Sequence, residues 1–115
     1  MKRGEIYWAT LEPRSGSEQR GLRPVILVSH DSFNSTPGWK SLIVVPVSRS
    51  DVQARRSFAT VLLKAGSGGL SEDSVALCHQ VTTLDRGKFK SLIGNLNEEL
   101  LEQVSDGLRA VMQLI

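Results

Sequence analysis

Short hydrophobic runs separated by polar segments fill the first two-thirds of the chain. Such runs, bounded by polar residues, are typical of strands, and an unbroken apolar run indicates burial on both faces. They occupy residues 6–11, 24–28, 42–47, 58–63 and 75–78, with a weaker one at 92–93. The segments between them, residues 13–22, 31–40, 48–57 and 64–73, are rich in Gly, Ser, Pro, Asp and Asn, as loops are. The pattern predicts a small barrel or a strongly curved sheet.

Two details refine this prediction. Pro46 lies inside the third run and cannot donate to a ladder, which indicates a sheet edge or a bulge at that point. Residues 31–34 fit a single helical turn, with Asp31 as its N-cap.

The periodicity changes near the C-terminus, where apolar residues recur at steps of three and four. This spacing predicts one face of a helix. The residues concerned are Leu100, Leu101, Val104, Leu108, Val111, Met112 and Ile115. Asn97 is the predicted N-cap, followed by two glutamates where the helix dipole favours negative charge. Gly107 costs about 1 kcal/mol in helix propensity, so we expect a close backbone approach there.

Composition narrows the class of protein. The chain has 115 residues, 40% hydrophobic and 23% charged, which predicts one globular domain over residues 1–115. No apolar run approaches the roughly 18 residues of a membrane span, and no signal sequence follows Met1, so we expect a cytoplasmic protein without a membrane partner. One cysteine and two histidines exclude a thiolate zinc cluster.

Charge is unevenly distributed along the chain. Residues 1–60 carry nine basic and five acidic side chains, whereas residues 61–115 carry five basic and seven acidic ones. A basic N-terminal half is expected of a face that binds a polyanion such as nucleic acid. It is also expected of any well-solvated domain, so charge alone leaves both interpretations open.

Two motifs look chemically interesting but fit structural interpretations better. Residues 66–69 read Gly-Ser-Gly-Gly without the lysine or the spacing of a phosphate-binding loop, which favours a flexible hairpin turn. Cys78 and His79 resemble a nucleophile beside its base, but adjacent side chains of a strand point to opposite faces. Cys78 is therefore interpreted as a small buried residue.

The most informative segment is residues 16–24, Gly-Ser-Glu-Gln-Arg-Gly-Leu-Arg-Pro. Two glycines bracket a charged stretch, and Pro24 forces Arg23 into an extended conformation. A mobile basic loop that ends in a stiffly held arginine suits phosphate binding, because the guanidinium can bond two phosphate oxygens at once. The alternative is a solvent-exposed loop whose arginine only flanks a strand.

Several segments, in chain order, resemble the MazF/PemK toxin family. Residues 1–8 read MKRGEIYW and residues 16–19 read GSEQ, followed by Gly21 and then Arg-Pro-Val at 23–25. Residues 31–34, 45–48 (VPVS) and 80–85 (QVTTLD) also match. The resemblance covers essentially the whole chain.

This resemblance implies a small SH3-like barrel, with a short helix in a loop and a C-terminal helix, that acts as a homodimer. It implies a sequence-specific endoribonuclease of a type II toxin–antitoxin system, inhibited by a cognate antitoxin protein. The 2′-hydroxyl of single-stranded RNA attacks the adjacent phosphate, giving a cyclic phosphate and a 5′-hydroxyl. That chemistry needs a base, a proton donor and positive charge at the phosphate. It implies no metal and no other cofactor.

The resemblance also implies site residues. Arg23 matches the catalytic arginine, and Ser48 falls where many members have a catalytic threonine. His79 falls where members have an acidic residue, and an imidazole transfers protons near neutral pH; base stacking or a structural role is its alternative. Leu77 replaces an arginine of some members, so phosphate stabilisation would rest more on Arg23.

The remaining candidates are RNA contacts. Ser17 stands where some members have a histidine, and His30 is interpreted as structural. We expect RNA to lie along the dimer interface, against the loops at residues 13–22 and 48–57. The predicted RNA-binding residues are Ser17, Glu18, Gln19, Arg20, Arg49, Arg55, Arg56 and Gln80.

Two other functions compete with this one. A gyrase-binding toxin of the same fold would have no nuclease activity, and the pairing of Arg23 with a hydroxyl at position 48 argues against it. A non-catalytic SH3-like adaptor would need an aromatic-lined groove. We expect most of the six aromatic residues to be used in the core instead.

Overall fold

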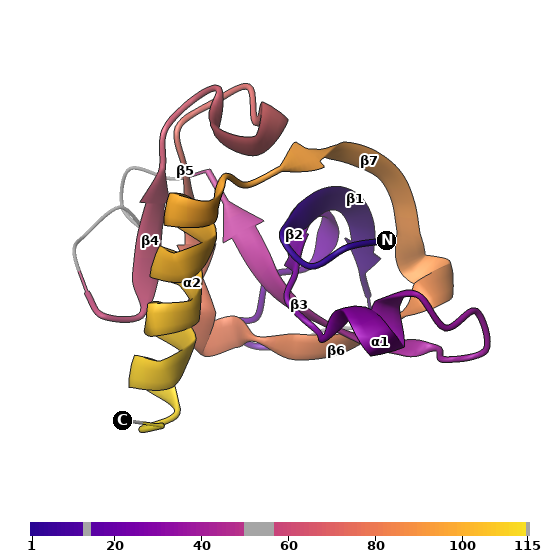
Figure 1. The fold of residues 1–115 in the computed structure, drawn as a ribbon. Coiled ribbons are helices and arrows are strands. Elements are labelled where there is room, and N and C mark those ends of the chain that lie inside the picture. Colours follow the sequence, from indigo (N-terminus) through magenta and orange to yellow (C-terminus); the bar gives the residue numbers. More distant parts are fainter. Residues whose placement is uncertain (13–14, 50–56, 115) are drawn as a thin grey trace.

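A curved antiparallel sheet with a helix packed against one side forms the molecule (Figure 1). The computed structural model describes residues 1–12, 15–49 and 57–114. Its strands are β1 (Glu5–Leu11), β2 (Gly21–Leu27), β3 (Ser41–Ser48), β4 (Thr60–Leu63), β5 (Ser74–Leu77), β6 (Thr82–Asp85) and β7 (Phe89–Asn95). Helix α1 (Asp31–Asn34) is a single turn, and α2 (Glu98–Val111) follows β7. Short 3₁₀ turns are η1 (Ser67–Gly69), η2 (Cys78–Gln80) and η3 (Arg86–Lys88). The predicted mainly β fold class with a C-terminal helix is confirmed.

Over the residues that the structure describes, the sheet does not close through hydrogen-bonded strands. Its two ends are brought together by packing of the β4–β5 connection against β7. Its order is β4-β5-β3-β2-β1-β7, with β6 paired to β3. Turn η1, in the β4–β5 connection, packs against β7: a Cβ at Gly69 would lie 2.6 Å from the carbonyl oxygen of Ile93, and one at Gly94 would overlap the carbonyl of Gly68. Residues 66–69 thus lie in a hairpin connection, as predicted, and their backbone packs directly against the backbone of β7. The term barrel applies only loosely.

The apolar runs are buried on both faces, as their pattern predicts. Along β2, Val25 and Leu27 belong to one core cluster and Ile26 belongs to the other. Pro46 lies opposite Val25 of β2 and so is not at the outer edge of the sheet, but the predicted interruption of the ladder is present. On the other side of β3 the β6 ladder ends at Val44 and the β5 ladder begins at Val47. Proline is tolerated because it falls where β3 changes partners.

Strand β6 was not predicted from the pattern. It pairs with residues 41–44 of β3, but within it only Leu84 is buried. A four-residue strand with three polar residues carries too little hydrophobic alternation to be recognised. The same reason explains why β7, expected only at residues 92–93, extends over seven residues: none of them is fully buried.

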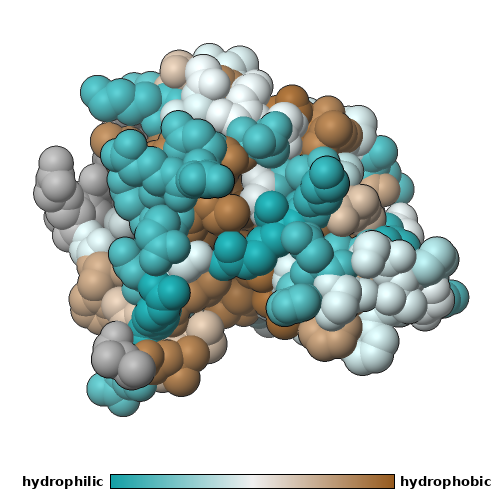
Figure 2. Space-filling view, viewed as in Figure 1, coloured by the Kyte–Doolittle hydropathy of each residue, from teal (hydrophilic) through white to brown (hydrophobic). Residues whose placement is uncertain are grey.

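Helix α2 forms as its periodicity predicts. The Asn97 side chain accepts a hydrogen bond from the backbone N–H of Leu100 at 2.8 Å, which confirms it as the N-cap. Val104 and Gly107 are buried against the sheet side, while Figure 2 shows a hydrophilic outer face. A Cβ at Gly107 would lie 2.6 Å from Sγ of Cys78, so the expected close approach is confirmed. No helix in the described ranges is long and apolar enough to span a membrane.

Helix α1 corrects one predicted cap. His30, not Asp31, is the N-cap, and its Nδ1 accepts a hydrogen bond from the N–H of Ser32 at 3.0 Å. Asp31 instead accepts from the N–H of Arg3 at 2.6 Å and from Asn34 at 3.1 Å. These hydrogen bonds to its charged form hold the pKa of Asp31 below its usual range. The structural interpretation of His30 fits this capping role.

Two arginines hold the fold together, so they do not belong to a free basic face. The Arg3 guanidinium donates to the carbonyl of Val28 and to the hydroxyl of Ser105, joining the N-terminus to α2. Arg86 donates to four carbonyl oxygens around α1, those of Phe33, Asn34, Thr36 and Trp39. Basic charge along the sequence therefore overstates the charge available to a polyanion.

The aromatic residues contradict the expectation that most of them fill the core. Tyr7 and Phe89 are half-buried, and the other four, Trp8, Phe33, Trp39 and Phe58, are exposed. Aliphatic side chains from the two-faced strands already fill both core clusters. The aromatic rings are thus left at the surface, where they are available for binding.

Candidate active site

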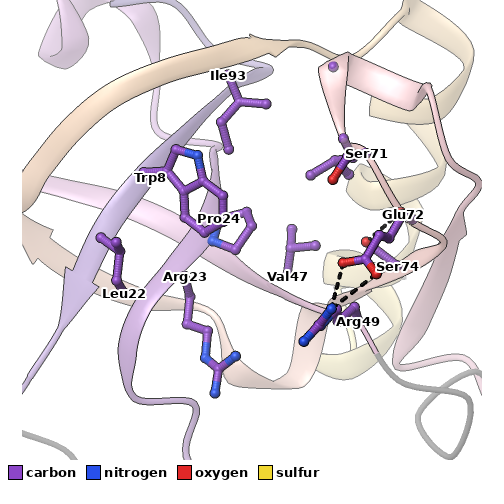
Figure 3. Close-up of a pocket in the computed structure, with 12 residues that line it drawn as sticks. Trp8, Leu22, Arg23, Pro24, Val47, Arg49, Ser71, Glu72, Ser74 and Ile93 are labelled. Carbon is purple, nitrogen blue, oxygen red and sulfur yellow. Dashed lines mark hydrogen bonds and ion pairs between the residues drawn. The ribbon is translucent and has the colours of Figure 1, made fainter.

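Arg23 stands in the first half of β2, where Pro24 keeps it extended. It lies opposite Ala9 of β1, and its side chain is exposed. Its Nε donates a hydrogen bond to the carbonyl oxygen of Arg20 at 3.0 Å. The guanidinium is thereby directed toward the loop at residues 15–20. Figure 3 shows it pointing away from the pocket that the stem of Arg23 helps to line.

Ser48 lies at the same end of the β2–β3 ladder as Arg23. It is the last residue of β3 and lies opposite Val75 of β5, with 9% of its surface exposed. The last pair of the β2–β3 ladder joins Val25 and Pro46, and Arg23 and Ser48 each lie two residues beyond that pair. From Val47 onward, β3 pairs with β5 instead. Arg23 and Ser48 are therefore near one end of β2 and β3, but they are not a ladder pair.

His79 lies in η2 and helps to line a pocket of about 280 Å³. The pocket is lined by residues 17–19 of the loop, Pro46 and residues 79–82. Pro46 and Ser48 are two residues apart in β3, so their side chains point to the same side. The pocket thus places the exposed His79 beside Pro46, which is two residues from Ser48 and pairs with Val25, two residues from Arg23.

Gln80 connects the Arg23 and His79 regions through the loop. Its Oε1 accepts a hydrogen bond from the N–H of Gln19 at 2.8 Å, and its Nε2 donates to the carbonyl of Ser17 at 3.3 Å. Because Arg23 bonds to Arg20 of the same loop, the loop is held at both ends of the site. Glu18 and Ser17 are exposed beside it. The predicted RNA contacts in this loop therefore adjoin the predicted catalytic residues.

Arg49 lies at a second pocket, of about 390 Å³, which the stem of Arg23 also borders. Its Nη1 contacts both carboxylate oxygens of Glu72, at 2.7 and 3.0 Å. Trp8 and Pro24 form the opposite wall (Figure 3). The sequence analysis did not identify Trp8 or Glu72 as site residues. Trp8 could have been noticed as an aromatic residue in an alternating strand, but no sequence pattern pointed to Glu72. Arg55 and Arg56 lie outside the described residues.

Cys78 has the predicted structural role, for a different reason. Strand β5 ends at Leu77, so Cys78 begins a 3₁₀ turn and is not a strand residue. It is fully buried, and burial raises the pKa of its thiol to about 11. At neutral pH the thiol stays protonated, which suits a packing residue and not a nucleophile. Within the described ranges, no group of three or more His, Cys, Asp or Glu side chains is arranged to hold a metal ion.

Comparison with known proteins gives a consistent relationship. Residues 2–112 match the family model of the PemK-like, MazF-like toxin of type II toxin–antitoxin systems. The chain is 31% identical to the endoribonuclease EndoA of Bacillus subtilis, covering 100% of this chain and 97% of that protein. It is 29% identical to the endoribonuclease MazF of Staphylococcus saprophyticus, covering 94% and 88%.

Solved structures share the fold. MazF of Deinococcus radiodurans superposes with a TM-score of 0.80 at 24% identity, covering 98% of this chain and 96% of that one. A mycobacterial endoribonuclease, solved in complex with its cognate antitoxin, gives a TM-score of 0.80 at 15% identity, covering 100% and 97%. With the match over residues 2–112, the chain belongs to the PemK-like, MazF-like family of type II toxin–antitoxin toxins.

Proposed function

We propose that residues 1–115 form one toxin domain that cleaves single-stranded RNA at specific sequences. The 2′-hydroxyl attacks the adjacent phosphate, and the products carry a cyclic phosphate and a 5′-hydroxyl. The observation that carries this proposal is the family match over residues 2–112, supported by the position of Arg23 and Ser48 at the same end of the β2–β3 ladder. The two relatives with nuclease names, from B. subtilis and S. saprophyticus, support the reaction class.

Each residue has a chemical role in this proposal. The Arg23 guanidinium stabilises the negative charge that develops on the phosphorane. The Ser48 hydroxyl hydrogen-bonds a phosphate oxygen, and His79 transfers a proton to or from the reacting oxygens. Leu77, where an arginine would assist in some relatives, is buried and uncharged. Arg23 therefore supplies most of the charge stabilisation.

Substrate binding involves the loop and the basic residues around the site. Bases and phosphates would contact Ser17, Glu18, Gln19, Arg20, Arg49, Arg55, Arg56 and Gln80. Gln80 is already hydrogen-bonded to the backbone of Ser17 and Gln19, so RNA would bind next to a loop that these bonds hold in place. This arrangement needs no metal and no cofactor.

The first prediction concerns the ends produced by cleavage. We expect purified protein to cleave mixed RNA in excess EDTA, because the nucleophile belongs to the RNA and the charge comes from Arg23. Enzymatic phosphorylation and sequencing of the new termini should reveal 5′-hydroxyl ends at a common motif. Loss of cleavage in EDTA that magnesium restores would contradict the proposed chemistry.

The second prediction concerns assembly. We propose a cytoplasmic homodimer that a cognate antitoxin inhibits, its acidic segment ordering as it binds the RNA groove. Exposed Leu62 on β4, with Met112 and Leu114 at the end of α2, offers apolar surface for such contacts. Light scattering should give twice the 12.6 kDa chain mass. A monomer that still cleaves RNA would rule out a shared groove.

A further inference from the structure

The pocket beside Arg49 has the composition of a binding site for a flat ring with a charged group attached. Its volume of about 390 Å³ falls within the range of small-ligand pockets, roughly 300–1,000 Å³. One wall is apolar: Trp8 of β1 lies opposite Pro24 of β2, and Ile93 of β7 adjoins them (Figure 3). Trp8 is 39% exposed despite lying in a central strand. An exposed indole on a rigid strand is a preorganised stacking surface for a base.

The opposite wall is polar and carries the Arg49–Glu72 pair. Arg49 and Glu72 keep 69% and 55% of their side-chain surface exposed, so water and ligands reach both. Both carboxylate oxygens of Glu72 contact one nitrogen of the guanidinium, Nη1, at a position where phosphate oxygens could bind instead. An exposed ion pair of this kind contributes little to stability. It can therefore be exchanged for a phosphate at small cost.

Arg23 borders this pocket with its stem, while its guanidinium points away from the pocket and bonds to the carbonyl of Arg20. A chain of RNA whose reacting phosphate lies at Arg23 would carry its neighbouring nucleotide to the pocket's edge. We propose that the pocket is a nucleotide subsite, in which Trp8 stacks on a base and Arg49 binds a phosphate after releasing Glu72. Glu72 thus acts as an internal competitor for the RNA backbone. The identity of the occupant rests on the function proposed above.

The test of stacking compares the chain's two tryptophans. Trp39 is 45% exposed and stacks on Phe33, away from the pocket, so Trp39→Leu is a matched control for Trp8→Leu. The probe is a mixed pool of fully 2′-O-methylated seven-nucleotide RNAs, which lack the attacking hydroxyl. By fluorescence anisotropy, Trp8→Leu should weaken binding by about 5- to 150-fold, whereas Trp39→Leu should not.

Each variant also retains a single tryptophan, which reports directly on its own environment. In the Trp39→Leu protein, the pool should quench the fluorescence of Trp8; in the Trp8→Leu protein, Trp39 should not respond. This readout holds even if Trp8→Leu folds poorly, because the Trp39→Leu protein keeps the pocket intact. Saturable binding without quenching of Trp8 would overturn the stacking role.

The competition is tested by neutralising the carboxylate. Glu72→Gln should tighten binding about two- to fivefold at low salt, because it frees Arg49. Arg49→Gln should weaken binding and reduce the salt-dependence slope by about 0.7, the value for one phosphate contact on a single strand. In the Arg49→Gln background, Glu72→Gln should have no further effect. Glu99→Gln, on α2, makes the same charge change away from the pocket and should leave affinity unchanged.

Two results separate this inference from the function on which it rests. If the wild type cleaves RNA but Glu72→Gln changes RNA affinity by the same factor with Arg49 present and with Arg49→Gln, the internal competition is wrong and the nuclease function stands. If RNA binding quenches the fluorescence of Trp8 but the wild type cleaves none of the mixed RNA, the nuclease function is wrong and the stacking site stands.

Discussion

Replacing Arg23 by alanine is expected to slow RNA cleavage by about 10²–10³-fold, corresponding to roughly 2.7–4 kcal/mol of transition-state stabilisation. The guanidinium is the proposed source of positive charge at the phosphorane, and Leu77 supplies no second charge. Arg23 is exposed, so its loss should leave the free energy of unfolding within about 0.5 kcal/mol. Single-turnover cleavage and thermal unfolding measure these two effects, and growth inhibition should fall with the cleavage rate.

Two further variants define what Arg23 contributes. Arg23→Lys retains the charge but loses the planar fork, so its rate should lie between those of the wild type and the alanine variant. Lys64→Ala removes an exposed charge outside both pockets and should cleave normally. A folded Arg23→Ala protein that remains fully toxic without cleaving RNA would favour the gyrase-binding alternative.

The strands that could be predicted are those whose side chains are buried on both faces. For β2 and β3, burial of every second residue on each side requires an unbroken apolar run, and that run is visible in the sequence. Strand β6 is specified differently, because its pairing with β3 depends on the partner and not on its own three polar residues. Likewise, Pro46 could be recognised as a ladder interruption, but not as the point where β3 exchanges β6 for β5.

The candidate catalytic residues could be named from the sequence because they lie in motifs. The residues that contact them in the fold could not be predicted in this way. The Arg49–Glu72 pair joins residues 23 positions apart, and Gln80 bonds to a loop 61 positions away. No local pattern encodes such pairs; they follow from the β3–β5 register and from the position of η2. The same is true of Trp8, whose exposure depends on which strands flank β1.

Replacing His79 by alanine is expected to slow RNA cleavage by about 10²–10⁴-fold. His79 is exposed and lines the pocket formed with Ser17–Gln19 and Pro46. If it transfers a proton, the plot of rate against pH for the variant should lose one of its limbs. His79→Gln should lose the same limb, since its amide keeps hydrogen bonds but cannot titrate.

The second histidine provides the control. His30 caps α1 through Nδ1, and asparagine can cap a helix in its place, so His30→Asn should preserve both the fold and the pH profile. A base-stacking role predicts another pattern for His79: His79→Ala would raise the KM and leave the shape of the pH profile intact. An unchanged rate and profile would leave Arg23 and Ser48 as the site, and the proton would then have to move through solvent or the RNA itself.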